Sequence, residues 1–242
     1  MRLIWLGGLI AAAALIVVVL VVAVSGGNGP KSLSTKTAQA RVASLLKGIP
    51  QSGDVQNGIV LGNPKAPVTV TEYGDLVCPI CQEFAVGAEA QLIKNEVRHG
   101  KVKLIYRANE TASSQANNGE YVAGQVAARA AGLQKLGWNY ILLWYLQQQD
   151  ETTPYVTPSF LQGLANQIPG LNKAKWKAQL DNPNLAGYVT VDGREMNSLV
   201  SDGTFSQNAT PAIMTVGPKG RAPSVVGLAP YSTFQAYIKG VS

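Results

Sequence analysis

A run of β-branched residues that leads into a pair of cysteines constrains the fold of this 242-residue chain more than any other feature. Residues 68–71 alternate valine and threonine, which is typical of a strand. Cys78 and Cys81 follow, separated by a proline and an isoleucine, and residues 79–97 then have the pattern of a helix. Pro79 suits the first helical turn, where its missing N–H has no partner to lose. The sequence therefore predicts a strand, a cysteine-bearing turn and a helix.

Four apolar residues recur at every fourth position of that predicted helix. They are Ile80, Phe84, Ala88 and Leu92. Residues four apart lie on one side of a helix, so the pattern predicts that these four side chains form its buried face.

The rest of the chain alternates strand-like and helix-like segments. Short strands are expected at residues 58–62, 101–107, 211–217 and 222–228, helices throughout residues 113–202, and a last helix at residues 231–240. The last two strands are joined by a Gly-Pro-Lys-Gly turn. About 185 residues from residue 58 onward suit one domain with a sizeable core. The predicted fold class is α/β with an inserted all-helical region.

The N-terminus carries 22 uncharged residues, Leu3 to Val24. At ~1.5 Å per helical residue they span the ~30 Å hydrocarbon core of a bilayer. We expect a single-pass transmembrane anchor. The alternative is a cleaved signal peptide, whose apolar region is normally only ~7–15 residues long. A simple count of the basic residues that flank the span would place the long C-terminal side in the cytoplasm. Long domains translocate largely regardless of charge, so we expect an extracytoplasmic domain.

Residues 25–57 resemble a tether, with a flexible first part and a possible short helix within residues 35–49. The tether contains four basic residues and a single acidic one, Asp54. It therefore either lies along anionic lipid head groups or is simply solvated. Residues 58–242 hold fifteen basic and thirteen acidic residues. A nearly neutral domain of this kind has no electrostatic footprint for nucleic acid, and we expect none as a partner.

The two cysteines allow three interpretations. A structural zinc site needs four ligands, and the chain offers two cysteines and one histidine, His99, unless carboxylates complete the set. A structural disulfide would close a loop so short that it stabilises the fold very little. The third interpretation is a redox pair. A helix N-terminus favours the thiolate of Cys78, and Cys81, one turn later, lies within reach to form a disulfide.

The segment "GNPKAPVTVTEYGDLVCPICQEFA" resembles the active-site segment of DsbA-like thioredoxin-fold disulfide oxidoreductases, and "ATPAIMTVGPKG" resembles their second marker. The resemblance covers about residues 58–242. It implies a thioredoxin fold with an inserted helical domain, and it implies that Pro211 is a cis-proline facing the cysteines. Thr210 would then supply backbone for substrate docking, beside Pro79 and Ile80. No bound cofactor is implied.

Glu72 stands six residues before Cys78, where the family carries an acid behind the active site. A strand carboxyl that points inward would have its pKa raised and could hold the proton of the resolving thiol. The alternative is a surface glutamate. Asp75 is expected to shape the turn. Two positions depart from the family: Ile80 stands where the most oxidising members carry histidine, and Ala209 where glycine is common.

We therefore expect a membrane-anchored, extracytoplasmic dithiol oxidase of cysteine-containing secreted proteins, reoxidised by a membrane partner of the DsbB or vitamin K epoxide reductase kind. The alternatives are a reductase or isomerase of the same fold, or a binding or chaperone protein without turnover. The expected organisation is an anchor with a cytoplasmic N-terminus (1–24), a tether (25–57), an N-terminal thioredoxin part with the active site (58–112), a helical insertion (113–202) and a C-terminal thioredoxin part (203–242).

Overall fold

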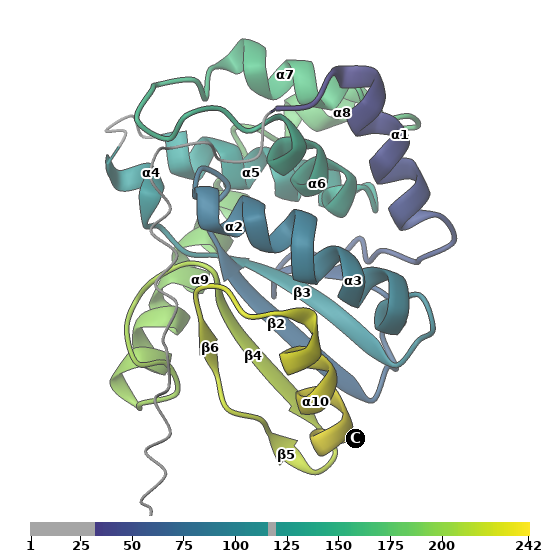
Figure 1. The fold of residues 1–242 in the computed structure, drawn as a ribbon. Coiled ribbons are helices and arrows are strands. Elements are labelled where there is room, and N and C mark those ends of the chain that lie inside the picture. Colours follow the sequence, from purple (N-terminus) through teal and green to yellow (C-terminus); the bar gives the residue numbers. More distant parts are fainter. Residues whose placement is uncertain (1–31, 116–119) are drawn as a thin grey trace, which may run out of the picture.

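The computed structural model describes residues 32–115 and 120–242, and Figure 1 shows their arrangement. The expected anchor at residues 1–24 lies outside them. None of the helices in the two described ranges is both long and apolar enough to cross a membrane.

A sheet with the strand order β1-β3-β2-β4-β5 forms the centre of the fold, and β6 also pairs with β4. The strands are β1 (Ile59–Leu61), β2 (Val68–Gly74), β3 (Val102–Ala108), β4 (Ala212–Gly217), β5 (Gly220–Arg221) and β6 (Val225–Val226). β2 runs parallel to β3 and antiparallel to β4. β2 is therefore the central strand, and six of its seven residues are buried, because helices cover both faces of the sheet.

One face of the sheet is covered by the helix that follows the cysteines and by the C-terminal helix (Figure 1). The first is continuous from Pro79 to Val97 and comprises α2 (Pro79–Phe84), α3 (Ala90–Leu92) and the π-helical turns η1 (Ala85–Glu89) and η2 (Ile93–Val97). The second is α10 (Tyr231–Val241). On the other face α9 (Pro183–Ser201) packs against β3.

The buried face of the helix differs from the one that the sequence predicts. Ile80 is 40% exposed and Ala88 is only partly buried, whereas Phe84 and Leu92 are buried as expected. A π-helical turn takes one residue more than an α-helical turn, so η1 shifts the inward-facing position by one place. Glu89 occupies that position, and its side chain is fully buried.

The helical region between β3 and β4 is present as predicted. Its elements are α4 (Ala112–Gln115), α5 (Glu120–Gly132), α6 (Gly137–Gln147), α7 (Pro158–Asn166), α8 (Lys173–Ala178) and α9. α6 is buried along nearly its whole length and contributes two tryptophans, Trp138 and Trp144, to the core.

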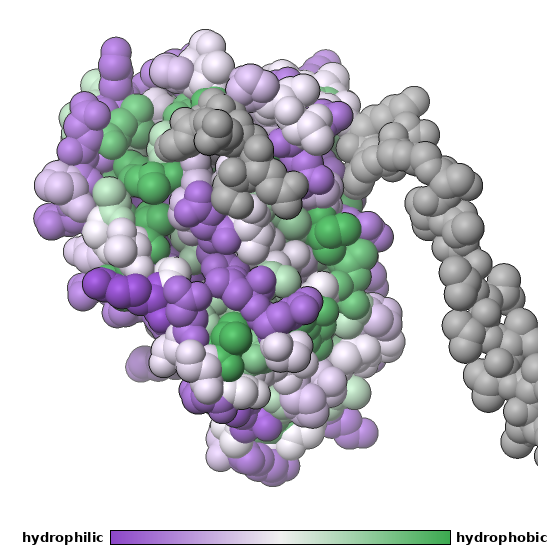
Figure 2. Space-filling view, turned by 90° about the vertical axis from the view of Figure 1, so that its left-hand side faces the viewer, coloured by the Kyte–Doolittle hydropathy of each residue, from purple (hydrophilic) through white to green (hydrophobic). Residues whose placement is uncertain are grey.

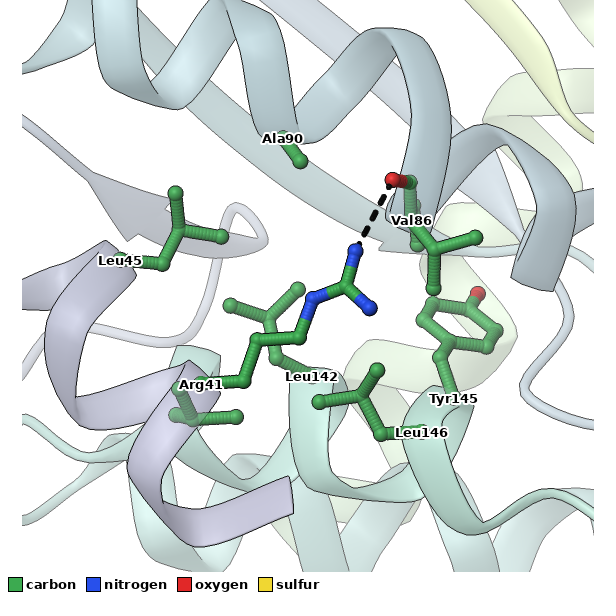
Figure 3. Close-up of a pocket in the computed structure, with 9 residues that line it drawn as sticks. Arg41, Leu45, Val86, Ala90, Leu142, Tyr145 and Leu146 are labelled. Atoms are coloured by element: carbon green, nitrogen blue, oxygen red, sulfur yellow. Dashed lines mark hydrogen bonds between the residues drawn. The ribbon is translucent and has the colours of Figure 1, made fainter. Parts of the chain in front are cut away.

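Residues 33–57 differ from the predicted tether because they pack against the domain. α1 (Thr35–Leu46) lies beside α6 and buries Ala38, Val42 and Leu46. Figure 3 shows Arg41 of α1 reaching across a small apolar pocket to the backbone oxygen of Val86 at 3.5 Å. The short helix predicted here is confirmed, and it is a structural part of the fold.

The predicted strand at residues 222–228 is interrupted. β5 and β6 each comprise two residues, and Pro223 lies between them. Proline has no N–H to donate to a neighbouring strand, so the ladder breaks there.

A buried ionic cluster ties the helical region to the sheet. Asp192 of α9 accepts hydrogen bonds from Arg107 of β3, Arg129 of α5 and the backbone N–H of Ala108. Arg129 also donates to the backbone oxygen of Val55. The cluster thus joins four segments that are distant in the sequence.

Candidate active site: a cysteine pair beside a cis-proline

Cys78 is the N-cap residue of α2, directly after the turn that leaves β2. Its extended backbone (φ −68°, ψ 122°) ends the turn, and Pro79 occupies the first helical position. The carbonyl of Cys78 accepts the first helical hydrogen bond, from the N–H of Gln82 at 3.1 Å. Cys78 is 6% exposed and Cys81 is fully buried, and both carry free thiols. The two sulfurs therefore have unequal access to solvent.

A loop from the far end of the chain packs against Cys78. The Thr210–Pro211 peptide bond is cis, which confirms the expectation for Pro211. The thiol of Cys78 donates to the backbone oxygen of Thr210 at 3.6 Å. The cysteine pair and the two loop residues singled out in the sequence are thus brought together.

The environments of the two thiols shift their pKa values in opposite directions. The pKa of Cys78 is lowered from 9.0 to about 7. The largest cause is a hydrogen bond from the Cys81 thiol. Burial raises the pKa, whereas the Thr210 side chain and the backbone N–H groups of Cys81 and Ile80 lower it further. Burial is the main reason that the pKa of Cys81 is raised. Near neutral pH, Cys78 is therefore present in part as a thiolate, and Cys81 is the thiol that stabilises this thiolate.

Glu72 lies behind the cysteines on β2 and is 2% exposed, so the alternative of a surface glutamate is excluded. Burial raises its pKa well above the ordinary value, and the neighbouring acid Glu89 raises it further. A charge on Cys78 also raises the pKa of Glu72, and a charge on Glu72 raises the pKa of Cys81. Burial and the neighbouring acids therefore favour the protonated form of Glu72.

Asp75 shapes the turn before Cys78, as the sequence predicts. It is fully buried and accepts hydrogen bonds from the backbone N–H groups of Val77, Thr111 and Ser113. Because Thr111 and Ser113 follow β3, this carboxylate fixes the active-site turn to the start of the helical region.

Exposed apolar side chains flank the site. Ile80 is 40% exposed and Leu228 is 45% exposed. Leu228 belongs to the loop beside the cis-proline, because the N–H of the preceding residue, Gly227, donates to the backbone oxygen of Pro211 at 2.8 Å. On the side of the molecule shown in Figure 2, hydrophobic groups form separate patches between polar ones.

The structure does not support a zinc site within the described ranges. No three His, Cys, Asp or Glu side chains in residues 32–115 and 120–242 are grouped so that they could hold a metal ion. His99 lies in the turn after η2, at the opposite end of the long helix from the cysteines, and is exposed.

Sequence reasoning missed three residues that surround the site: Glu89, Tyr106 and Tyr145. Each is buried, and each comes from a different element. No local pattern marks them, because only the folded chain brings η1, β3 and α6 to the back of the cysteine pair.

A mixed sheet, a Cys-Pro-Ile-Cys segment at a helix N-terminus and a cis-proline loop against Cys78 define a thioredoxin-fold protein of the dithiol–disulfide type. The family model described as "Thioredoxin" matches residues 54–224. The chain belongs to the thioredoxin family, and its fold carries an inserted helical region between β3 and β4.

Its relatives agree with this assignment. "Disulfide bond formation protein D" of Bacillus subtilis is 27% identical over 133 residues, which cover 55% of this chain and 59% of that protein. The chain therefore spans about three fifths of this curated relative. The crystal structure of oxidised BdbD from Bacillus subtilis superposes with a TM-score of 0.62 at 22% identity, over 79% of this chain and 96% of that one. The structure of Pseudomonas aeruginosa DsbA2 gives 0.57 at 20% identity, over 76% and 93%.

Proposed function

We propose that the chain is a thiol–disulfide oxidoreductase that uses Cys78 and Cys81 to introduce disulfides into secreted proteins. The observation that carries the proposal is the inequality of the two thiols. Cys78 has a lowered pKa at a helix N-terminus beside the cis-proline loop, whereas Cys81 is buried and protonated. Thiol–disulfide exchange uses such a pair, with one reactive sulfur and one shielded resolving sulfur. The names of the curated relatives point to the same chemistry.

The reaction begins from the Cys78–Cys81 disulfide. A substrate thiolate attacks the sulfur of Cys78, the disulfide breaks, and Cys81 leaves with the bonding electrons and takes up a proton from Glu72. A second substrate thiolate attacks the substrate sulfur of the mixed disulfide, and Cys78 leaves as a stabilised thiolate. The substrate loses two electrons and two protons, and the protein disulfide gains the electrons. The disulfide is itself the electron acceptor, so the reaction needs no bound cofactor.

Substrate docking is assigned to the surface around Cys78. The backbone of Thr210 and Pro211 can hold an extended peptide across the site, because it already lies against the Cys78 sulfur. Pro79, Ile80 and Leu228 supply apolar contacts. An unfolded polypeptide exposes apolar side chains together with its cysteines, and this surface suits such a substrate.

A stoichiometric transfer experiment tests the proposal. Oxidised full-length protein is mixed with a reduced peptide that contains two cysteines, and free thiols are counted by mass spectrometry after acid quenching. We expect one peptide disulfide for each protein disulfide consumed, and none with Cys78→Ser. A binding or chaperone protein would leave the peptide reduced. In a glutathione redox titration, the cysteine pair of a reductase would instead remain reduced at ratios of oxidised to reduced glutathione that already oxidise the peptide.

The proposed location is the outer side of the cytoplasmic membrane, with Leu3–Val24 as a single-pass anchor that contacts lipid. A quinone-linked membrane protein of the DsbB or vitamin K epoxide reductase kind is proposed as the oxidant that restores the disulfide. We expect the protein to stay with membranes after carbonate washing and its domain to be accessible to protease from outside. A soluble, shortened form would show that the segment is a cleaved signal peptide.

A further inference from the structure

Two buried carboxyl groups face each other behind the cysteine pair. Glu72 is 2% exposed and Glu89 is fully buried. Neither carboxyl accepts a hydrogen bond from any N–H or hydroxyl donor in the described part of the chain. Each lies within hydrogen-bonding reach of the other. Two carboxylates at that distance cannot both be ionised in a buried space, so the pair must hold at least one proton.

Glu89 reaches this position through the π-helical turn η1. In a regular helix, residue 88 would lie beneath Phe84, whereas the wider turn places Glu89 there. Glu72 points to the same side of β2 as Gly74, where a Cβ atom would lie 2.9 Å from the Glu72 Oε1 and 2.6 Å from the Tyr106 ring. The absence of a side chain at Gly74 leaves room for the Glu72 carboxyl beneath the helix.

The other titratable groups around the pair come from three further elements and the active-site turn. They are Cys78 and Cys81 of α2, Tyr106 of β3, Tyr145 of α6 and Asp75 of the turn. All of these are acids or neutral hydroxyl groups. Burial raises the pKa of both glutamates, and no cationic side chain in the described ranges lowers either one. Among the described residues, the polar group that acts on each carboxyl is the other carboxyl, and a charge on Cys78 also acts on Glu72.

We propose that Glu89 is a positioning residue that acts through Glu72, and that the two carboxyls form a proton store for the resolving thiol. This inference rests on the proposed function. The doubly protonated pair gives one proton from Glu72 to the Cys81 sulfur as the disulfide breaks. The proton that remains is shared between the two carboxyl groups, with Glu89 donating it to the new Glu72 carboxylate. A proton from water later replaces the one given.

The test compares four full-length variants with the wild type. Glu89→Gln keeps a hydrogen-bond donor at position 89 but removes the acid. Glu89→Leu removes the donor as well as the acid. Glu72→Gln removes the acid that gives its proton to Cys81. Glu96→Gln is the matched control, because Glu96 is a buried acid of the same long helix whose partners are Lys101 and Tyr231. The oxidised proteins are reduced by dithiothreitol in stopped flow over a range of pH. Each rate is divided by the concentration of dithiothreitol thiolate.

We expect the normalised rate of the wild type to fall with rising pH as the pair loses its protons. In Glu89→Gln the maximum rate is kept, but the fall moves to lower pH, because Glu72 ionises more readily beside an amide than beside an acid. In Glu89→Leu the maximum falls about 10-fold, because the Glu72 carboxylate has lost a charge-assisted hydrogen bond. Glu72→Gln falls about 100-fold, which is the loss of a general acid. Glu96→Gln matches the wild type.

Superimposed pH profiles for the wild type and both Glu89 variants would overturn the inference and leave the proposed function intact. If dithiothreitol reacts with the wild type no faster than with a variant that lacks both cysteines, the inference and the proposed function are both overturned. If Glu89→Leu fails to fold, the pH shift of Glu89→Gln decides alone, since a merely structural role of Glu89 predicts no shift.

Discussion

The hydrogen bond between the two thiols gives the most specific prediction. The pKa of Cys78 is lowered from 9.0 to about 7, and the Cys81 thiol is the largest cause. At ~1.4 kcal/mol per pKa unit, the whole lowering corresponds to about 3 kcal/mol of thiolate stabilisation. A hydrogen bond to a charged group contributes about 1.5–3 kcal/mol, and a thiol is a weak donor, so its share lies at the lower end.

Cys81→Ala removes this donor, and Cys81→Ser replaces it with a hydroxyl. We expect the pKa of Cys78 to rise by about 1 in Cys81→Ala and to stay close to the wild-type value in Cys81→Ser. The helix N-terminus and Thr210 remain in both variants, so the rise is incomplete. Each variant keeps a single cysteine, and the rate of its alkylation by iodoacetamide against pH therefore reports Cys78 alone. If both variants titrate alike, the thiol of Cys81 does not stabilise the thiolate and this account of the site is wrong.

Three further outcomes follow from other parts of the structure. Asp192→Ala should lower the free energy of unfolding by about 3–5 kcal/mol in chemical denaturation, because it leaves the buried Arg129 without its acidic partner. Asp181→Asn, at an exposed position, should change it little. The raised pKa values of Glu72 and Glu89 favour the folded state fully below about pH 4.5, and this contribution is lost as pH rises through their folded values. The free energy of unfolding of the oxidised wild type should therefore fall with rising pH, and that of Glu89→Gln should fall less steeply. If both fall equally steeply with pH, Glu89 does not share a buried site with Glu72. Adding a donor with Ile80→His should make the disulfide more oxidising by some tens of millivolts in glutathione buffers, at ~30 mV per 1.4 kcal/mol, and an unchanged or lower potential would refute this reasoning.

Local patterns were sufficient to predict the parts of the site that are close in sequence. The β-branched residues before Cys78 form β2, and the proline after it begins α2, because strand propensity and helix capping depend on neighbouring residues. The inward-pointing Glu72 was expected from the resemblance to the family, with a surface glutamate as the alternative, and its burial decides between the two.

Features that depend on distant contacts or on a change of helical register could not be predicted in the same way. The four-residue repeat predicts Ala88 as the buried residue, and only the π-helical turn makes it Glu89. A short helix within residues 35–49 was predicted, but its apolar residues did not reveal that α6 supplies the surface they cover. Pro223 divides the last predicted strand, although the surrounding residues have a strand pattern.

We propose that Cys78 is the sulfur that exchanges with substrate. This proposal is tested most directly by trapping the mixed disulfide between Cys81→Ser and a peptide disulfide, followed by proteolysis and mass spectrometry. With the resolving thiol removed, we predict a stable adduct that maps to Cys78 and that forms faster as the pH rises through about 7. No adduct, or one that forms only as the pH approaches the ordinary cysteine value of 9.0, would contradict the account.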